Sequence, residues 1–247
     1  MRPFGGRVRS QLADRTTVAV LGMHRSGTSA VAGMLAEQGV ELGPVSEKNR
    51  FNPRGNREIP ELNRLHDRVL ERSGGSWWQP PARVRIRRSD LRRRNEILKG
   101  IRGRTVGVKD PRTLLLLEMW QDLEPKPIGV VRNPVAVRAS LERRAHERQR
   151  RHPQLSSAEW EQLWLMYNRI LLAERRRREF PVIDFDRTDD LGDQVRRALD
   201  FWGIDAREEP RFFESELAAH VNEDWRAEAT APEVVALYEE LASLASA

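Results

Sequence analysis

The sequence predicts an α/β protein in which a central parallel sheet lies between two layers of helices. Short apolar segments alternate with longer segments of helical periodicity along the chain. Several of the short segments are apolar throughout, which is typical of parallel strands covered on both faces. A glycine-flanked loop joins the first of them to a helix, as in a P-loop. We therefore expect a three-layer fold of P-loop type.

The length and composition limit the number of domains and the class of function. A chain of 247 residues fits one α/β domain, and we expect a flexible leader at 1–15 followed by a single domain at 16–247. The absence of cysteine excludes disulfides, thiolate metal ligands and a cysteine nucleophile, and it agrees with a cytoplasmic location. No apolar run reaches membrane-spanning length. The net charge of +6 favours an anionic ligand.

The first apolar segment leads into a loop that is suited to binding an anion. Val18–Leu21 is predicted to be a buried strand, and the loop Gly22–Gly27 has the glycine spacing of a P-loop. Thr28 and Ser29 then open an alanine-rich helix. At such a junction, backbone N–H groups and the helix dipole place partial positive charge at one point.

The side chains of this loop distinguish it from the P-loop of an NTPase. The lysine that reaches the β- and γ-phosphates of a nucleotide is replaced by Thr28. The positive charge comes earlier, at Arg25, beside His24. We expect the loop to bind a single phosphate through its backbone, Ser26, Thr28 and Ser29, and to be poorly suited to a triphosphate.

The next segments surround the mouth of the predicted site. The polar stretch 46–58 lacks helical periodicity and is predicted to be a loop over the site, whereas 59–72 has the apolar spacing of a helix. Trp77-Trp78 forms an aromatic corner, either in the core, which is favoured, or lining an acceptor site. The arginine-rich stretch 83–104 is more simply a solvated helix face than a binding site.

Two further strands each end at a basic residue. The apolar stretch 105–108 precedes Lys109, and 127–131 precedes Arg132, with Ser140 in the helix that follows. Because ligands of parallel sheets bind beyond the carboxyl ends of the strands, these residues and the first loop should meet at one edge. The remaining predicted elements are a turn with a short extended piece at 39–43, helices at 114–120, 156–178 and 189–202, a mobile segment at 142–151, a strand at 180–185 and two short helices beyond Pro210.

Three short stretches together resemble one enzyme family. Arg25-Ser26-Gly27-Thr28-Ser29 resembles the 5′-phosphosulfate-binding loop of sulfotransferases, in the arginine-bearing form of tyrosylprotein and many bacterial members. RNPVAVRAS at 132–140 resembles the element of that family that binds the 3′-phosphate, and VKDPR at 108–112 resembles its KDP motif. The resemblance covers 16–140 by motif and the rest more loosely.

This resemblance implies a reaction and its donor. Such enzymes use 3′-phosphoadenosine-5′-phosphosulfate (PAPS). The sequence would then encode a sulfotransferase that moves the sulfuryl group from PAPS to an acceptor hydroxyl by in-line displacement and releases 3′-phosphoadenosine-5′-phosphate (PAP). The acceptor is expected to be a small molecule, a carbohydrate or a peptide, and its identity does not follow from the sequence.

The resemblance also implies roles for individual residues. The PAPS-binding residues are expected to be His24, Arg25, Ser26, Gly27, Thr28, Ser29, Arg132 and Ser140, and the catalytic residues are expected to be Arg25, Glu58 and Lys109. A guanidinium can donate two hydrogen bonds to a phosphate, and a serine hydroxyl adds a neutral donor. Lys109 would neutralise charge on the bridging oxygen as the S–O bond breaks. Glu58 would accept the hydroxyl proton, with Glu47 and His66 as alternatives.

The sequence departs from the cytosolic members of the family in one respect. No GxxGxWK element, which closes over the nucleotide in those enzymes, follows Asp205, and 212–225 is the candidate for that role. The histidines lack metal-ligand spacing with carboxylates, so no metal is expected. The oligomeric state is left open.

Two other functions are compatible with these observations. A P-loop nucleotide or small-molecule kinase would use the same loop, although Thr28 in the lysine position argues against it. A non-enzymatic module could bind polyanions through 83–104. The aromatic residues typical of single-strand nucleic-acid binding are missing from that stretch, so nucleic acid is not an expected partner.

Overall fold

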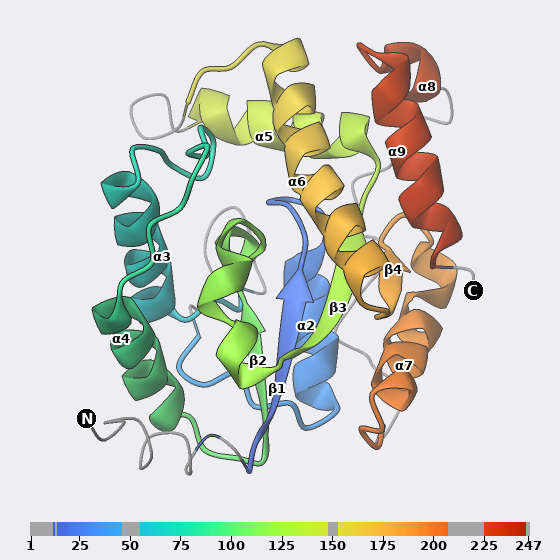
Figure 1. Ribbon diagram of the computed structural model, residues 1–247. Coiled ribbons are helices and arrows are strands. Elements are labelled where there is room, and N and C mark those ends of the chain that lie inside the picture. Colours follow the sequence, from blue (N-terminus) through green and yellow to red (C-terminus); the bar gives the residue numbers. More distant parts are fainter. Residues whose placement is uncertain (1–11, 13, 46–54, 148–152, 207–224, 246–247) are drawn as a thin grey trace.

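The core of the molecule is a sheet of four parallel strands. Figure 1 shows the computed structural model, which describes residues 12, 14–45, 55–147, 153–206 and 225–245. The strands are β1 (Thr16–Leu21), β2 (Thr105–Lys109), β3 (Lys126–Val131) and β4 (Val182–Asp184), in the spatial order β2-β1-β3-β4. All three pairings are parallel, as the apolar runs predict.

The order of the strands creates a switch point beside β1. The chain leaves β1 to form β2 on one side of it, and then crosses over to form β3 and β4 on the other side. Ligands of open α/β sheets bind in the crevice beyond the carboxyl ends of the strands at such a reversal. Here that crevice lies between the ends of β1 and β3, where Gly22 and Arg132 follow.

The two faces of the sheet are covered by different helices. Alternate residues of β1 point to opposite faces, since Val18 and Val20 belong to one apolar cluster and Ala19 and Leu21 to the other. The first cluster packs against α2 (Thr28–Glu37) and α7 (Leu191–Phe201). The second packs against α3 (Pro60–Arg72), α6 (Ser157–Arg177) and α9 (Pro232–Ser243). In Figure 1, α6 crosses in front of the sheet and α2 lies behind it. The three-layer arrangement is therefore confirmed.

The remaining elements complete the front layer and the connections. They are α4 (Arg88–Lys99), α5 (Pro134–Glu147), α8 (Trp225–Glu228) and three 3₁₀ segments, η1 (Pro111–Met119), η2 (Gln121–Leu123) and η3 (Thr188–Asp190). The longest helix, α6, begins at a capping box in which the Ser156 hydroxyl accepts the N–H of Glu159 and the Glu159 carboxylate accepts the N–H of Ser156. The isolated pairing of Glu41 with Val106 confirms the short extended piece expected after α2.

Two segments differ from the sequence-based expectation. Residues 142–147 continue α5 and are not a mobile excursion, because Val137, Leu141 and Ala145 recur at helical spacing and are buried. The helix expected at 114–120 is a 3₁₀ segment that starts at Pro111 and is interrupted by a non-helical backbone at Leu116. Residues 148–151 of the expected excursion lie outside the described residues.

Several other expected segments fall partly outside the described residues. These are the leader up to residue 11, the loop at 46–54 and the capping candidate at 212–224. Where the chain is described again, Leu12 packs against the core, and the Arg15 guanidinium donates hydrogen bonds to the carbonyl oxygens of Leu98 (3.2 Å) and Ile101 (2.8 Å). The end of the predicted leader is thus attached to the domain.

Most arginines of the stretch 83–104 are exposed, and two arginines of α4, Arg93 and Arg94, make ion pairs within the fold. Arg94 is fully buried, and its guanidinium donates to both carboxylate oxygens of Asp122, at 2.7 and 2.8 Å. Arg93 forms an ion pair with Glu61 across to α3. The exposure of the other arginines agrees with the solvated helix face expected for 83–104, whereas the buried Arg94 departs from it. The two residues of the aromatic corner differ in burial: Trp77 is buried in the core, whereas Trp78 is 37% exposed.

Candidate functional site

The loop after β1 has the backbone geometry of an anion site. Gly27 takes φ 86° and is the N-cap of α2, and no side chain caps that helix end by a hydrogen bond. The first N–H groups of a helix have no partner within it, so those of Thr28 and Ser29 are available at the loop mouth. Arg25 also adopts a left-handed backbone, with φ 69°. A non-glycine residue held there stores strain of the kind found at functional sites.

The structure brings Arg25, Arg132 and Ser140 together. The Arg25 Nε–H donates to Ser140 Oγ at 2.8 Å, and the Arg132 guanidinium donates to the carbonyl oxygen of Arg25 at 3.3 Å. Arg132 and Ser140 are both buried. The end of β3 and the first turns of α5 therefore touch the loop after β1, as the sequence predicts. The Arg25 side chain lies toward Ser140.

Positive charge is concentrated in this corner. Burial, together with the nearby charges of Arg144, Arg132 and Arg143, lowers the pKa of Arg25 to about 10. The pKa of Arg132 is lowered as well, mainly by burial. Guanidinium groups crowded around an uncapped helix start are stabilised by an anion, which supplies the opposite charge and accepts their hydrogen bonds.

A second polar cluster lies at the end of β2. Lys109 Nζ donates to Glu58 Oε1 at 2.6 Å, to the carbonyl oxygen of Asn56 at 3.0 Å and to Ser29 Oγ at 3.1 Å. Asn63 Nδ2 donates to the other oxygen of Glu58 at 2.7 Å. Lys109 thus reaches the start of α2 from a neighbouring strand, and it brings positive charge to the loop in which Thr28 occupies the lysine position. Lys109 pairs with Glu58, whereas the adjacent Asp110 pairs with His66 and Arg112.

Asp110 belongs to a buried network behind that cluster. It accepts hydrogen bonds from Arg112 and pairs with His66 at 2.7 Å. Burial alone would raise the pKa of Asp110, but the charges of Arg112 and His66 and their hydrogen bonds hold it well below its ordinary value. His66 is fully buried here, so this conformation does not present it to an acceptor. The other alternative base, Glu47, lies outside the described residues.

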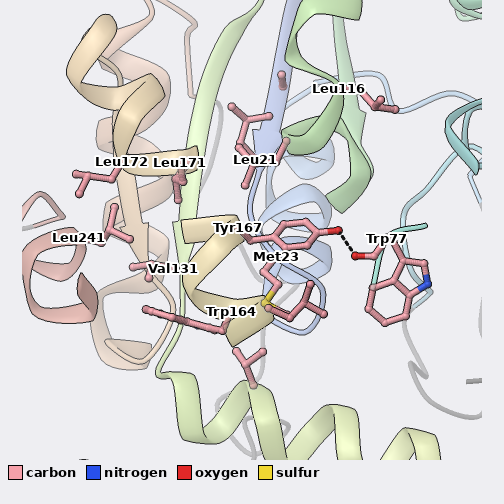
Figure 2. Packing of buried hydrophobic residues seen from close by; sticks show 14 of the residues in the cluster. Leu21, Met23, Trp77, Leu116, Val131, Trp164, Tyr167, Leu171, Leu172 and Leu241 are labelled. Carbon is pink, nitrogen blue, oxygen red and sulfur yellow. Dashed lines mark hydrogen bonds between the residues drawn. The ribbon is translucent and has the colours of Figure 1, made fainter. Parts of the chain in front are cut away.

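His24 and Ser26 face the interior. The His24 ring lies 4.2 Å from the Trp77 ring, centroid to centroid, and burial lowers its pKa well below the ordinary value, so the imidazole is neutral at neutral pH. Figure 2 shows Tyr167 pointing toward Trp77 beneath this corner, where its hydroxyl donates to the Trp77 carbonyl oxygen at 2.9 Å. Ser26 is fully buried, and its N–H donates to the Met23 carbonyl oxygen. Both residues shape the loop in this conformation.

Two residues that the sequence analysis did not select complete the site. Asp186 follows β4 and lies 3.6 Å from Arg132 Nε, measured to Oδ1. Tyr238 of α9 contacts Asp186 through its hydroxyl. Asp186 follows the expected strand 180–185, so the rule that selected Lys109 and Arg132 could have found it. No local signal identifies Tyr238.

Two features concern the described residues as a whole. Within the described ranges, no group of three or more His, Cys, Asp and Glu side chains is placed to hold a metal ion. In the same part of the chain, no helix combines the length and apolarity that crossing a bilayer requires.

The carboxyl pair Asp184 and Asp186 leads to a prediction on pH and stability. Burial and the charge of Asp186 raise the pKa of Asp184 to about 6, although the Asp186 N–H, the Tyr238 hydroxyl and Arg187 act in the opposite direction. The unfolded value is 3.8, so the folded state binds the proton more tightly. This contribution to stability is present below pH 4 and is lost as the pH rises to about 6.

We expect Asp184→Asn to remove the loss of stability that ionisation of Asp184 causes as the pH rises. The amide keeps an oxygen for the Asp186 N–H and the Tyr238 hydroxyl, and it carries no charge. Relative to wild type, the variant should gain about 1–3 kcal/mol in the free energy of unfolding at pH 7.5. Urea titrations at pH 4.5, 5.5, 6.5 and 7.5 measure this. Asp200→Asn on the exposed face of α7 is the control, and equal pH profiles for the two variants would contradict the prediction.

Comparisons with known proteins bear on the fold. No protein-family model matches the sequence, and no curated protein matches it. Among solved structures, the chain is similar to a sulfotransferase from Alicyclobacillus acidocaldarius, with a TM-score of 0.57 and 19% identity over 92% of this chain and 95% of the other. It is also similar to the sulfotransferase domain from the curacin biosynthetic pathway, with a TM-score of 0.57 and 14% identity over 92% and 98%. The protein thus has the fold of sulfotransferases, which confirms the resemblance at that level.

Proposed function

We propose that this protein is a sulfotransferase that uses PAPS as donor and a small-molecule, carbohydrate or peptide hydroxyl as acceptor. One observation carries the proposal: the Arg25–Ser140 and Arg132–Arg25 hydrogen bonds join the two elements that resemble the phosphate-binding elements of sulfotransferases, beside the uncapped start of α2. Two anionic groups of one nucleotide can therefore be bound by neighbouring residues. The likeness to the two solved sulfotransferases supports the same reading.

The residues present fit a nucleotide with two separate phosphates. The N–H groups of Thr28 and Ser29 suit the 5′ end. Arg132 and Ser140 suit a 3′-phosphate, because the Ser140 hydroxyl can donate its proton to a phosphate while its oxygen accepts from Arg25. We place Arg25 between the two, with contact to either end. His24, Ser26 and Gly27 shape the loop.

The Lys109–Glu58 pair provides the groups for transfer. When bound, PAPS supplies a sulfuryl group that passes to the acceptor oxygen in line with departure of PAP. Lys109 Nζ already donates to Ser29 at the loop, and from there it can donate to an oxygen that gains charge. Glu58 is an acceptor for the hydroxyl proton, and its hydrogen bonds from Lys109 and Asn63 fix the orientation of its carboxylate.

Calorimetry with PAP tests this function. Wild type should bind PAP with an affinity that falls as salt is added, and Arg132→Ala should bind about 10–100-fold more weakly, since a charged hydrogen bond contributes about 1.5–3 kcal/mol. Arg93→Ala is the matched control, because Arg93 pairs with Glu61 and Glu96 away from the site. Equal PAP affinity in wild type and Arg132→Ala would exclude the proposal.

Assays of the same variants with ATP and with heparin test the other two functions. A kinase would hydrolyse or transfer phosphate from ATP in the presence of Mg²⁺, and a polyanion-binding module would bind heparin. Heparin binding lost in Arg93→Ala but kept in Arg132→Ala would favour the module. The ion pairs of Arg93 and Arg94 within the fold argue against that outcome.

A further inference from the structure

The guanidinium of Arg132 is oriented by residues at the end of β4. Asp186 Oδ1 lies 3.6 Å from Arg132 Nε, and Asp186 Oδ2 accepts the N–H of Asn133 at 2.5 Å. One carboxylate therefore contacts both the side chain and the backbone of the turn after β3. The Phe185 ring lies against the same guanidinium, 5.3 Å from ring centroid to Cζ. Arg132 thus meets Asp186 through Nε, whereas its Nη1 donates to the carbonyl oxygen of Arg25.

Asp186 is in turn contacted from the last helix of the chain. The hydroxyl of Tyr238 in α9 lies 3.1 Å from Asp186 Oδ2 and 3.1 Å from Asp184 Oδ1. A phenol has one proton and donates to one of these oxygens at a time. Tyr238 is buried and packs edge-on against Trp225, with ring centroids 5.1 Å apart, so its hydroxyl is held at this position.

The charges explain why such a donor matters. Burial raises the pKa of Asp186, and the Asn133 N–H, Arg132 and the Tyr238 hydroxyl all act in the opposite direction. The Tyr238 hydroxyl itself stays protonated, because burial and the two carboxylates raise its pKa. It therefore helps to keep Asp186 ionised and in place, and an ionised Asp186 attracts the Arg132 guanidinium through the ion pair at Nε.

We propose that Tyr238 is a positioning residue that acts through Asp186 to align Arg132 for the 3′-phosphate of an adenosine nucleotide. The C-terminal helix thus sets how strongly the site prefers nucleotides that carry a 3′-phosphate. This inference rests on the proposed function, since it concerns the same nucleotide site. It assigns no contact between Tyr238 and the ligand.

The test compares PAP with adenosine 5′-phosphate, which lacks the 3′-phosphate. Tyr238→Phe removes only the hydroxyl. The variant should bind PAP about three- to tenfold more weakly than wild type does, which corresponds to the loss of one hydrogen bond, and should bind adenosine 5′-phosphate as wild type does. The ratio of the two dissociation constants is the readout, and a general loss of stability would not change it.

A double-mutant cycle and a matched control complete the experiment. In an Arg132→Ala background, Tyr238→Phe should no longer change PAP affinity, because the group it aligns is absent. Tyr167→Phe is the control, since it also removes a buried hydroxyl, one that donates to the Trp77 carbonyl oxygen. It should lower the melting temperature and leave the ratio unchanged.

The outcomes separate this inference from the proposed function. If Arg132→Ala weakens PAP binding but Tyr238→Phe leaves the ratio unchanged, the positioning role is wrong and the sulfotransferase proposal stands. An equal effect of Tyr238→Phe with and without Arg132 also overturns the positioning role. If wild type does not bind PAP, the proposed function itself fails.

Discussion

Replacing Lys109 by methionine should lower the rate of sulfuryl transfer by about 10²–10³-fold, the usual effect of removing a donor that stabilises developing charge. Lys109 is the only basic side chain among the described residues that the structure shows bonded to Ser29 and Glu58 together. PAP affinity should change little, since PAP lacks the sulfuryl group. The rate is measured as PAP formed from PAPS, with an acceptor found by screening the wild type.

The buried partner of Lys109 requires a control for folding. Lys109 and Glu58 are both buried, and removing one member of a buried pair leaves an uncompensated charge that costs about 3–5 kcal/mol. The double variant Lys109→Met with Glu58→Gln removes both charges and should regain stability without regaining activity. If Lys109→Met is folded and transfers sulfuryl groups at the wild-type rate, the catalytic role is wrong.

Gly27→Ala should destabilise the fold and abolish nucleotide binding at once. A Cβ at this position would lie 2.1 Å from the Phe185 ring, and the backbone is at φ +86°. Overpacking of this kind costs about 1–3 kcal/mol and the left-handed backbone about 1–2 kcal/mol more. Because the Phe185 ring lies against Arg132, displacing it also displaces the guanidinium. Urea unfolding and PAP calorimetry measure the two effects.

Gly74→Ala provides a matched control for the backbone term. Gly74 has almost the same backbone, with φ +87°, but a Cβ there would have no heavy atom within 4 Å. The Gly74→Ala variant should lose only the part of the stability that depends on the left-handed backbone, and it should bind PAP as wild type does. Similar losses of stability and affinity in the two variants would show that contact with Phe185 is unimportant.

Local patterns were sufficient for much of the fold and for the individual site elements. The loop after β1 could be recognised because strand, glycine spacing and helix start are consecutive in the sequence. Lys109 and Arg132 could be selected because each follows an apolar strand, and the carboxyl ends of parallel strands share an edge. The convergence of Arg132 on the loop at Arg25 confirms that reasoning.

Contacts between distant segments could not be predicted in the same way. The Arg25–Ser140 and Lys109–Glu58 hydrogen bonds depend on side-chain directions that are set only when α2, α3 and α5 are packed. Tyr238 is an ordinary residue of an amphipathic helix until that helix lies against β4. Arg94 was counted among solvated arginines, and only tertiary packing shows that it is buried against Asp122. Helix propensity likewise does not reveal the kink at Leu116, which departs from helical geometry within η1.

The central position of β1 has a consequence for how the chain folds. Its two neighbours come from Thr105–Lys109 and Lys126–Val131, so both of its pairings join segments that are far apart in sequence. During synthesis β1 leaves the ribosome before either neighbour, and its second pairing cannot form until β3 has also emerged. Such non-local pairings close large loops before they gain contacts, so we expect slow refolding in vitro.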